Sequence, residues 1–203
     1  MRRPRSLAIA AVLSAMLILV GQAPASAATP VTFGATLDNT SQPSNAEGGK
    51  RCSDEIPTAE TCTWVSTQAY HNGSHAKAPR TGTIGKLKLV SCIAGSFIVQ
   101  MATPASNHRA RVVKNGPTIN YKADPQTVCG GDNSDAYVVQ TFAVNFTVTQ
   151  GDEIGIYASQ VGPLYCSGGS GVDLFSPPLG SNTAYRTRTD STSCNLMIQL
   201  VYR

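Results

Sequence analysis

A strict alternation of large apolar side chains with small or polar ones at residues 142–149 limits the possible fold more than any other feature of the chain. A period of two places the apolar set on one face of an extended segment, as in a β-strand with one face on a core. The turn sequence at residues 150–152 follows, and a second alternation begins at Ile154, which predicts a β-hairpin. The apolar members of the first alternation are Phe142, Val144, Phe146 and Val148.

Weaker alternations occur along the rest of the chain. No segment of ten or more residues repeats apolar side chains at the i, i+3, i+4 and i+7 positions of an amphipathic helix. Many short strands separated by Gly, Pro, Asn and Ser clusters predict an all-β fold, a two-layer antiparallel β-sandwich with the jelly roll as its expected topology. The further candidate strands are residues 31–37, 86–89, 97–101, 172–175, 185–189 and 196–202.

The first 27 residues have the three parts of a secretory signal peptide. Three arginines precede an uncharged stretch at residues 7–20, and Ala25-Ser26-Ala27 offers a cleavage site after Ala27. The uncharged stretch is shorter than the ~20 residues of a membrane-spanning helix, which disfavours a membrane anchor. We therefore expect removal of residues 1–27 as a signal peptide, by the general secretory route rather than the twin-arginine route, and one secreted, extracellular domain at residues 28–203.

The basic character of the chain comes mainly from this leader. Arg2, Arg3 and Arg5 belong to it, so the 16 basic residues of the whole chain become 13 against 12 acidic ones, and the net charge falls from +4 to +1. A near-neutral domain without a basic cluster in its sequence predicts no nucleic-acid partner. The same balance predicts no membrane partner after the leader is removed, and the oligomeric state is left open.

All six cysteines lie in the expected mature domain. An even number of cysteines in an exported chain predicts three disulfides, for which 15 connectivities exist. No cysteine has zinc-ligand spacing to another cysteine or to a histidine. Pairing between sequence neighbours is our hypothesis: Cys52–Cys62, Cys92–Cys129 and Cys166–Cys194.

Three motifs resemble those of exported, uncharacterised β-sandwich proteins of actinobacteria. They are the Cys–Cys loop ending in Thr61-Cys62-Thr63-Trp64, the strand Gly82-Thr83-Ile84, and the segment Gln150–Ile156. The resemblance covers most of the mature chain, and its motifs are structural. It implies an exported, jelly-roll-like β-sandwich and no particular activity.

Signatures of catalysis are weak in this sequence. Residues 168–171 do not form a G-x-S-x-G elbow, and three disulfides would leave no thiol as a nucleophile. His71 and His75 flank a turn and would not share one helix face as zinc ligands do. We therefore predict no catalytic residue and no cofactor. A carboxylate pair for glycoside hydrolysis remains an alternative, and Glu153 and Asp173 are the acids nearest to predicted strands.

An oxygen-rich loop offers weak calcium candidates in Asp132, Asn133 and Asp135, with Asp124 upstream. Calcium binds six to eight oxygens and accepts irregular loops. The spacing is not that of an EF-hand, and an acidic surface loop is the commoner explanation. A calcium ion here would be structural.

Aromatic residues in predicted loops are candidates for ligand binding. Sugar rings stack on exposed aromatic faces, while amides and carboxylates bind their hydroxyl groups. Trp64, beside Cys62, is instead predicted to lie in the core against a disulfide. The predicted ligand-binding residues are Tyr70, His71, Asn72, Tyr121, Asp124 and Tyr165.

These observations favour a secreted, non-catalytic, carbohydrate-binding module whose ligand is a glycan or other cell-envelope material. A structural or adhesion-type envelope protein that associates through a sheet edge is the alternative from another class. A hydrolase with a carboxylate pair is the third hypothesis. The glycan hypothesis rests on analogy with other β-sandwiches and requires exposed loop aromatics.

Overall fold

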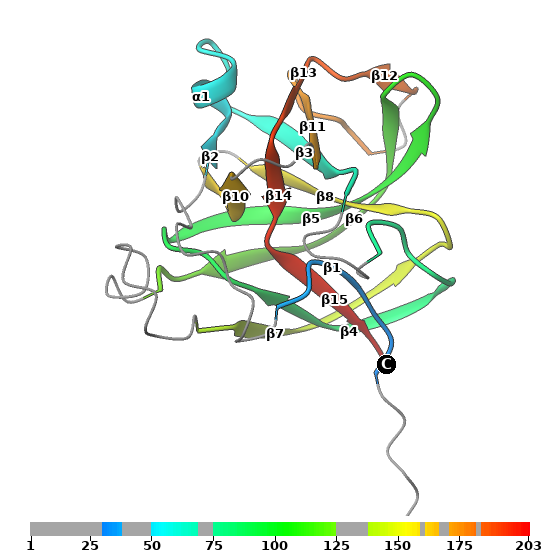
Figure 1. Cartoon of the computed structure of the whole chain (residues 1–203). Coiled ribbons are helices and arrows are strands. Elements are labelled where there is room, and N and C mark those ends of the chain that lie inside the picture. The colour runs from blue at the N-terminus through cyan, green and yellow to red at the C-terminus, as the bar shows by residue number, and fades with distance from the viewer. Residues whose placement is uncertain are drawn as a thin grey trace, which may run out of the picture.

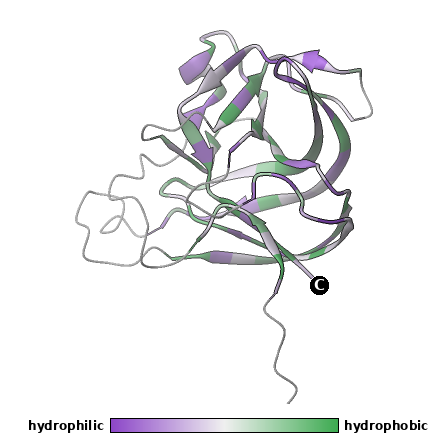
Figure 2. Ribbon diagram, turned by 45° about the vertical axis from the view of Figure 1, so that its right-hand side comes forward, coloured by the Kyte–Doolittle hydropathy of each residue, from purple (hydrophilic) through white to green (hydrophobic). Residues whose placement is uncertain are grey.

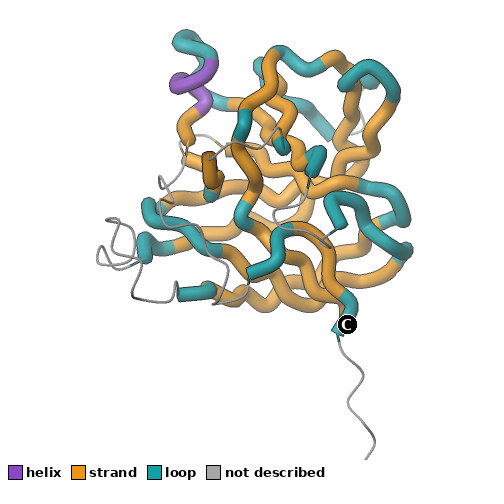
Figure 3. The backbone as a smooth tube through the Cα atoms, viewed as in Figure 1, coloured by secondary structure: helices purple, strands orange, loops and turns teal. Residues whose placement is uncertain are grey.

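The computed structural model describes residues 30–37, 50–68, 75–124, 138–158, 161–166, 171–181 and 184–203. Strands account for most of these segments, and α1 (Cys52–Glu55) is the only helix within them (Figure 3). Most strands belong to two antiparallel sheets, one of four strands and one of seven (Figure 1). The predicted all-β, antiparallel fold class is confirmed.

The four-stranded sheet joins the first described strand to the last. Its strands lie side by side in the order β1-β15-β4-β7, so β1 and β7 are its edge strands. In β7 the predicted alternation is realised: Val144 and Phe146 are buried, while Asn145 and Thr147 are exposed. The strands are β1 (Thr32–Gly34), β15 (Ile198–Tyr202), β4 (Gly82–Leu89) and β7 (Gln140–Val148).

The seven-stranded sheet has the order β12-β6-β5-β8-β3-β11-β13. Its longest strands, β5 and β6, form a hairpin. The strands are β12 (Arg186–Thr187), β6 (Arg109–Tyr121), β5 (Gly95–Ala105), β8 (Glu153–Ala158), β3 (Cys62–Ser66), β11 (Val172–Phe175) and β13 (Asp190–Thr192). Two short pairs complete the architecture: β10 (Leu164–Cys166) with β14 (Cys194–Leu196), and β2 (Lys50–Arg51) with β9 (Val161–Gly162).

Both large sheets contribute side chains to one hydrophobic core. Ile84 and Phe146 come from the four-stranded sheet, and Trp64 and Ile156 come from the seven-stranded one. The alternation of hydrophobic and hydrophilic residues along the strands is visible in Figure 2. Trp64 is fully buried in the same cluster as Cys62, as predicted.

Several strands differ from their predicted limits. The strands predicted on either side of the turn at 150–152 are present as β7 and β8, but the predicted hairpin between them is wrong, because β7 pairs with β4 in one sheet and β8 lies between β5 and β3 in the other. The turn therefore connects the two sheets. The predicted strand at 196–202 is divided between β14 and β15. Of the strand predicted at 185–189, only the two residues of β12 are extended in the sheet. Strand β6, which is 13 residues long, was not predicted, because Gly116 and Pro117 break its alternating pattern. The structure accommodates both residues where the pairing of β5 and β6 is irregular, between Ile98 and Gln100.

Two of the three predicted disulfides are shown. Cys52 is bonded to Cys62 and Cys166 to Cys194, with Cα–Cα distances of 5.7 and 3.9 Å. The third predicted pair, Cys92–Cys129, includes a residue outside the described ranges. None of the described cysteines is free, which indicates an oxidising environment.

The outer face of the seven-stranded sheet carries a second, smaller core. Residues 176–181, which we call the strap, cross this face and place Leu179 over Val65 and Val112. The hydroxyl of Thr63 donates to Gln100 Oε1 at 3.0 Å and accepts the Leu179 N–H at 3.0 Å. Gln100 Nε2 donates in turn to the Leu179 carbonyl at 3.2 Å. The strap is therefore fixed to the sheet by a buried polar network.

Candidate functional site

A pocket of about 720 Å³ lies beside α1, at the upper end of the molecule in Figure 1. Its volume lies within the range of roughly 300 to 1,000 Å³ that is typical of small-molecule sites. One wall is the short disulfide loop and the other is β9. The lining residues are Arg51, Cys52, Ser53, Pro57, Thr58, Ala59, Glu60 and Val161.

Covalent and polar links hold the walls of this pocket. The Cys52–Cys62 disulfide closes the loop over a sequence separation of 10. The backbone N–H of Arg51 donates to Asp54 Oδ2 at 2.7 Å, and this bond caps the first turn of α1. On the opposite wall, the Tyr121 hydroxyl donates to the Val161 carbonyl at 2.7 Å. The pocket is thus built by elements that are far apart in sequence.

The lining combines an apolar floor with a polar rim. Cys52, Ala59 and Val161 are buried, while Arg51 and Glu60 are exposed. The guanidinium supplies donors and the carboxylate supplies acceptors, and Ser53 and Thr58 add hydroxyl groups that can do both. Among the described residues, no aromatic side chain lines the pocket. The arrangement can therefore bind a polar ligand by hydrogen bonds rather than by ring stacking.

The predicted ligand-binding residue Tyr121 is part of the core instead. Its side chain is 4% exposed, and its ring centroid lies 5.6 Å from that of Phe97. Burial raises the pKa of its hydroxyl. The ring therefore cannot stack on a ligand at the surface, and its hydroxyl supports the pocket wall from inside.

Asp124 and Tyr165 are also structural. The Asp124 carboxylate accepts the Val138 N–H at 2.9 Å, and its own N–H donates to the Ser91 carbonyl. Burial raises the pKa of Asp124. Tyr165 is 6% exposed and lies in β10 opposite Asn195. The expectation that these residues form an exposed site was wrong, because each of them is buried between elements that were not evident in the sequence.

The remaining predicted site residues lie outside the described residues. These are Tyr70, His71 and Asn72 of the proposed sugar site, and the calcium candidates Asp132, Asn133 and Asp135. Within the described ranges, no three His, Cys, Asp or Glu side chains converge to hold a metal ion.

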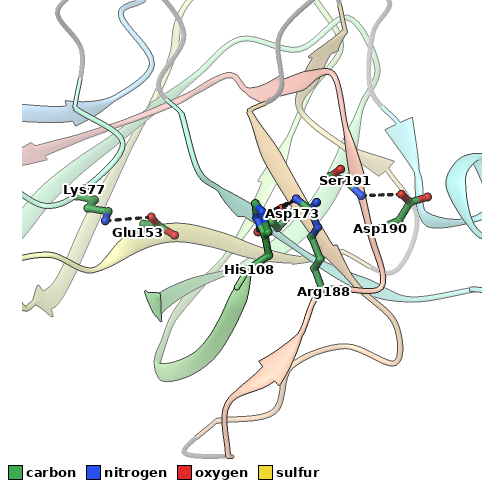
Figure 4. Close-up of polar contacts among 7 residues, drawn as sticks. All are labelled: Lys77, His108, Glu153, Asp173, Arg188, Asp190 and Ser191. Carbon is green, nitrogen blue, oxygen red and sulfur yellow. Dashed lines mark hydrogen bonds and ion pairs between the residues drawn. The ribbon is translucent and has the colours of Figure 1, made fainter. Parts of the chain in front are cut away.

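A second polar site lies on the outer face of the seven-stranded sheet and joins two buried carboxylates. Asp173 on β11 accepts a hydrogen bond from Arg188 Nη1 at 2.7 Å, and its other oxygen lies 3.5 Å from His108 Nδ1. Glu153 on β8 lies 3.9 Å from Lys77 Nζ. Figure 4 shows Asp173 between His108 and Arg188, with Glu153 and Lys77 to one side.

Sheet order brings these two acids to the same face. Gly155, Val65 and Asp173 form one row across β8, β3 and β11, and Glu153 is two residues from Gly155 along β8. Two inter-strand spacings amount to about 10 Å, so the two carboxyl groups lie on one face with β3 between their strands. Their placement on one face has no signal in the sequence, since it depends on β3 lying between β8 and β11.

The two carboxyl groups differ in their surroundings. Burial raises the pKa of Glu153 to about 7, Lys77 lowers it, and the negative charge of Asp173 adds to the increase. The effect of Lys77 is smaller than that of burial, because its side chain is 60% exposed and its charge is screened by solvent. Asp173 is instead bonded directly to a guanidinium. Glu153 is therefore able to donate a proton near neutral pH, which is a property of general acids.

The described segments contain no helix long and apolar enough to cross a membrane. Comparison with protein-family models, with curated proteins and with solved structures found no match for this chain.

Proposed function

We propose that this protein is a secreted, non-catalytic binding module that takes a hydroxyl-rich ligand, such as a segment of an envelope glycan, into the pocket beside α1. The observation that carries the proposal is the pocket itself, which has about 720 Å³ of space and a polar rim. Arg51 and Glu60 place opposite charges on that rim, so their combined charge favours a neutral polar ligand over an ion.

The disulfide loop supports this proposal through preorganisation. Cys52 begins α1 and Cys62 begins β3, so the bond between them ties the pocket wall to the seven-stranded sheet. A wall that is already ordered loses less conformational entropy when the ligand binds. Recognition would then depend on hydrogen bonds from the rim, since aromatic stacking is not offered by the lining residues.

We also propose a jelly-roll topology for the sandwich. Eight strands (β1, β3, β4, β5, β6, β7, β8 and β15), counted one to eight along the chain, pair as first with eighth, second with seventh, third with sixth and fourth with fifth. This is the pairing expected when a long antiparallel hairpin is wrapped into two sheets. The same proposal includes Cys92–Cys129 as a third disulfide.

Secretion is part of the proposed function. It is supported by the leader-like residues 1–27 and by the two disulfides, which persist in oxidising compartments. The measurement is the N-terminal sequence of the exported protein, which should begin at Ala28. An intact N-terminus on a cell-associated protein would contradict this part of the proposal.

The direct test is a binding screen of residues 28–203 against a glycan array and isolated cell-wall polysaccharides. We expect a ligand whose affinity falls about tenfold or more in Arg51→Ala and in Glu60→Ala, because each change removes a charged hydrogen-bonding group. Arg109→Ala is the matched control, since Arg109 is exposed on β6 and does not line the pocket. A ligand that binds all three variants equally well would place the site elsewhere.

The absence of any glycan ligand would favour the alternative of protein association. The nine-residue strand β7 is an edge of the four-stranded sheet and could accept a strand from a partner. Sedimentation of the purified protein with candidate envelope proteins would then be the next measurement.

A second candidate function is hydrolysis of a glycosidic bond by the carboxylate pair. The observation that favours it is the buried acid Glu153, with a pKa of about 7, on the same face of the sheet as Asp173, which is hydrogen-bonded to Arg188. Glu153 would donate a proton to the leaving oxygen, and Asp173 would stabilise positive charge or activate water. Release of nitrophenol from chromogenic glycosides, lost in Glu153→Gln and retained in Glu60→Gln, would support this function. No release from a broad glycoside panel would exclude it for those substrates.

A further inference from the structure

The exposed face of the four-stranded sheet is positively charged. None of its strands, β1, β4, β7 or β15, contains an Asp or Glu residue. Lys86 and Lys88 both project outward from β4, because Leu87 and Leu89 between and after them are buried in the core. Two residues along a strand span about 7 Å, which is the separation of these two lysine positions.

Arg203 adds a third cation to this face. It follows β15, and its side chain runs across Gly85 of β4, where any side chain would collide with the Arg203 Cγ. Its Nη2 reaches the Val144 carbonyl at 3.5 Å. The register between β4 and β7 is irregular at this point, between Ile84 and Lys86. Glycine at position 85 thus allows a guanidinium to lie flat on the sheet beside Lys86.

Lys114 brings a fourth cation to the edge of the same face. It belongs to β6 in the other sheet, and its Nζ donates a hydrogen bond to the Thr147 hydroxyl on the exposed side of β7. Within the described segments, none of the ion pairs involves Lys86, Lys88, Lys114 or Arg203. No described acidic side chain therefore neutralises them, and they add to one local positive potential, which the α-carboxylate of Arg203 in the protein of residues 28–203 lowers by one charge.

The surface between these cations is polar. The outward side chains of β7 are small or amidic, as at Ala143 and Asn145, and Gln199 lies on β15 opposite Lys88. Single-stranded nucleic acid is bound by exposed aromatic rings, and membranes are bound by apolar side chains that insert. The outward residues of β4, β7 and β15 include neither an aromatic ring nor an exposed large apolar group. A chain that presents both anions and hydroxyl groups fits this surface better.

We propose that the face formed by Lys86, Lys88, Arg203 and Lys114 binds an acidic polysaccharide, a linear glycan with repeated carboxylate groups. The carboxylates pair with the four cations, and hydroxyl groups of the sugar rings bond to Asn145 and Gln199. This surface is separate from the pocket, because α1, beside which the pocket lies, is at the opposite end of the molecule from β4, β7 and β15 (Figure 1). The proposal therefore does not depend on the proposed function of the pocket.

The test compares polygalacturonate with its fully methyl-esterified form, which keeps the sugar backbone and removes the charge. Binding to residues 28–203 is measured by calorimetry at about 50 and 250 mM NaCl. We expect binding to polygalacturonate alone, with affinity about tenfold or more lower at the higher salt, where the Debye length is shorter. Lys86→Gln/Lys88→Gln should lower the affinity at low salt about tenfold or more.

The matched control is Lys50→Gln/Arg109→Gln, which removes two exposed or half-exposed cations from other surfaces and gives the same net charge. It should keep most of the affinity for polygalacturonate. Equal losses in the two double variants would show that net charge matters and this face does not, which would overturn the proposal. Binding of the methyl-esterified polymer, no binding at low salt, or tighter binding of an oligonucleotide of equal charge would also overturn it. A pocket ligand retained by Lys86→Gln/Lys88→Gln would confirm that the two surfaces are independent.

Discussion

The ammonium of Lys77 lies 3.9 Å from the carboxylate of Glu153, yet the pKa of Glu153 is raised rather than lowered. The carboxyl group is buried, whereas the ammonium is mostly in water. Loss of hydration therefore outweighs the attraction between the two charges, and the nearby anion Asp173 acts in the same direction.

The pH dependence of stability should show this effect. The unfolded chain releases the Glu153 proton near the ordinary pKa of 4.5, whereas the folded protein holds it up to about 7. The folded state therefore binds more protons in this window, and the free energy of unfolding should fall as pH rises through it, by roughly 3 kcal/mol. Glu153→Gln should remove that decrease and be the more stable protein at pH 8.

Urea unfolding at several pH values between 4 and 8 measures this difference. Glu60→Gln is the control, because Glu60 is exposed and should follow the unmodified protein. If the free energy of unfolding changes with pH in the same way in Glu153→Gln and in the unmodified protein, the pKa of Glu153 in the folded state is not raised.

Loss of the Cys52–Cys62 disulfide should affect both stability and the pocket. Opening a loop of sequence separation 10 restores chain entropy worth about 3 kcal/mol to the unfolded state. We expect Cys52→Ser/Cys62→Ser to have a lower thermal midpoint and a weaker affinity for any pocket ligand. Binding of polygalacturonate should be unaffected as long as the variant is folded, which near-UV circular dichroism can verify.

Gly34 should not tolerate a side chain. Its φ of +95° is in the region that favours glycine, and a Cβ there would collide with the Ile198 carbonyl of the neighbouring strand and with the Ile154 side chain. Gly34→Ala should destabilise the fold by about 2 kcal/mol or more, in chemical denaturation. Gly151→Ala is the control that separates backbone strain from steric collision. The φ of Gly151 is +89°, so alanine is strained there too, but no atom lies within 4 Å of a Cβ at this position. If Gly151→Ala loses less free energy of unfolding than Gly34→Ala, the difference between the two variants measures the collision with Ile198 and Ile154.

The strap should depend on the hydroxyl of Thr63. Thr63→Val keeps the shape of the side chain, but it leaves Gln100 Oε1 and the Leu179 N–H buried without this partner. Such groups cost about 1 to 3 kcal/mol each, so a loss of a few kcal/mol is expected. Thr141→Val on the exposed side of β7 should change stability by less than about 0.5 kcal/mol. Faster proteolysis of the strap in Thr63→Val would show that the loss is local, whereas equal stability of both variants would contradict the role given to this network.

Prediction from sequence succeeded where the signal is local. The alternation around Phe146 identifies a half-buried strand, since side chains two residues apart must share a face of an extended chain. Neighbour pairing also agrees with Cys52–Cys62 and Cys166–Cys194, although only the first pair closes a short loop, with a sequence separation of 10 against 28. Strand β6 was missed because its Gly-Pro step resembles a turn until the irregular pairing with β5 is known.

The exposure of the predicted ligand-binding tyrosines could not be predicted from local sequence. Tyr121 and Tyr165 stand in polar sequence surroundings, which suggested exposed loops, but both are buried. Whether a tyrosine ring faces solvent depends on what packs over it, and for Tyr121 that includes Phe97 and the carbonyl of Val161. Neither contact has a local sequence signal.

The sequence by itself determined the strand-rich fold class, the even number of cysteines and the near-neutral charge of the domain after its expected leader. These properties follow from nearest-neighbour periodicity and from counting residues. The tertiary structure alone decided that Lys86, Arg203 and Lys114 share one face and that Glu153 approaches Asp173. The physical reason is that hydrogen-bonded sheet order sets which distant residues become neighbours about 5 Å apart, and this order depends on packing of the whole core.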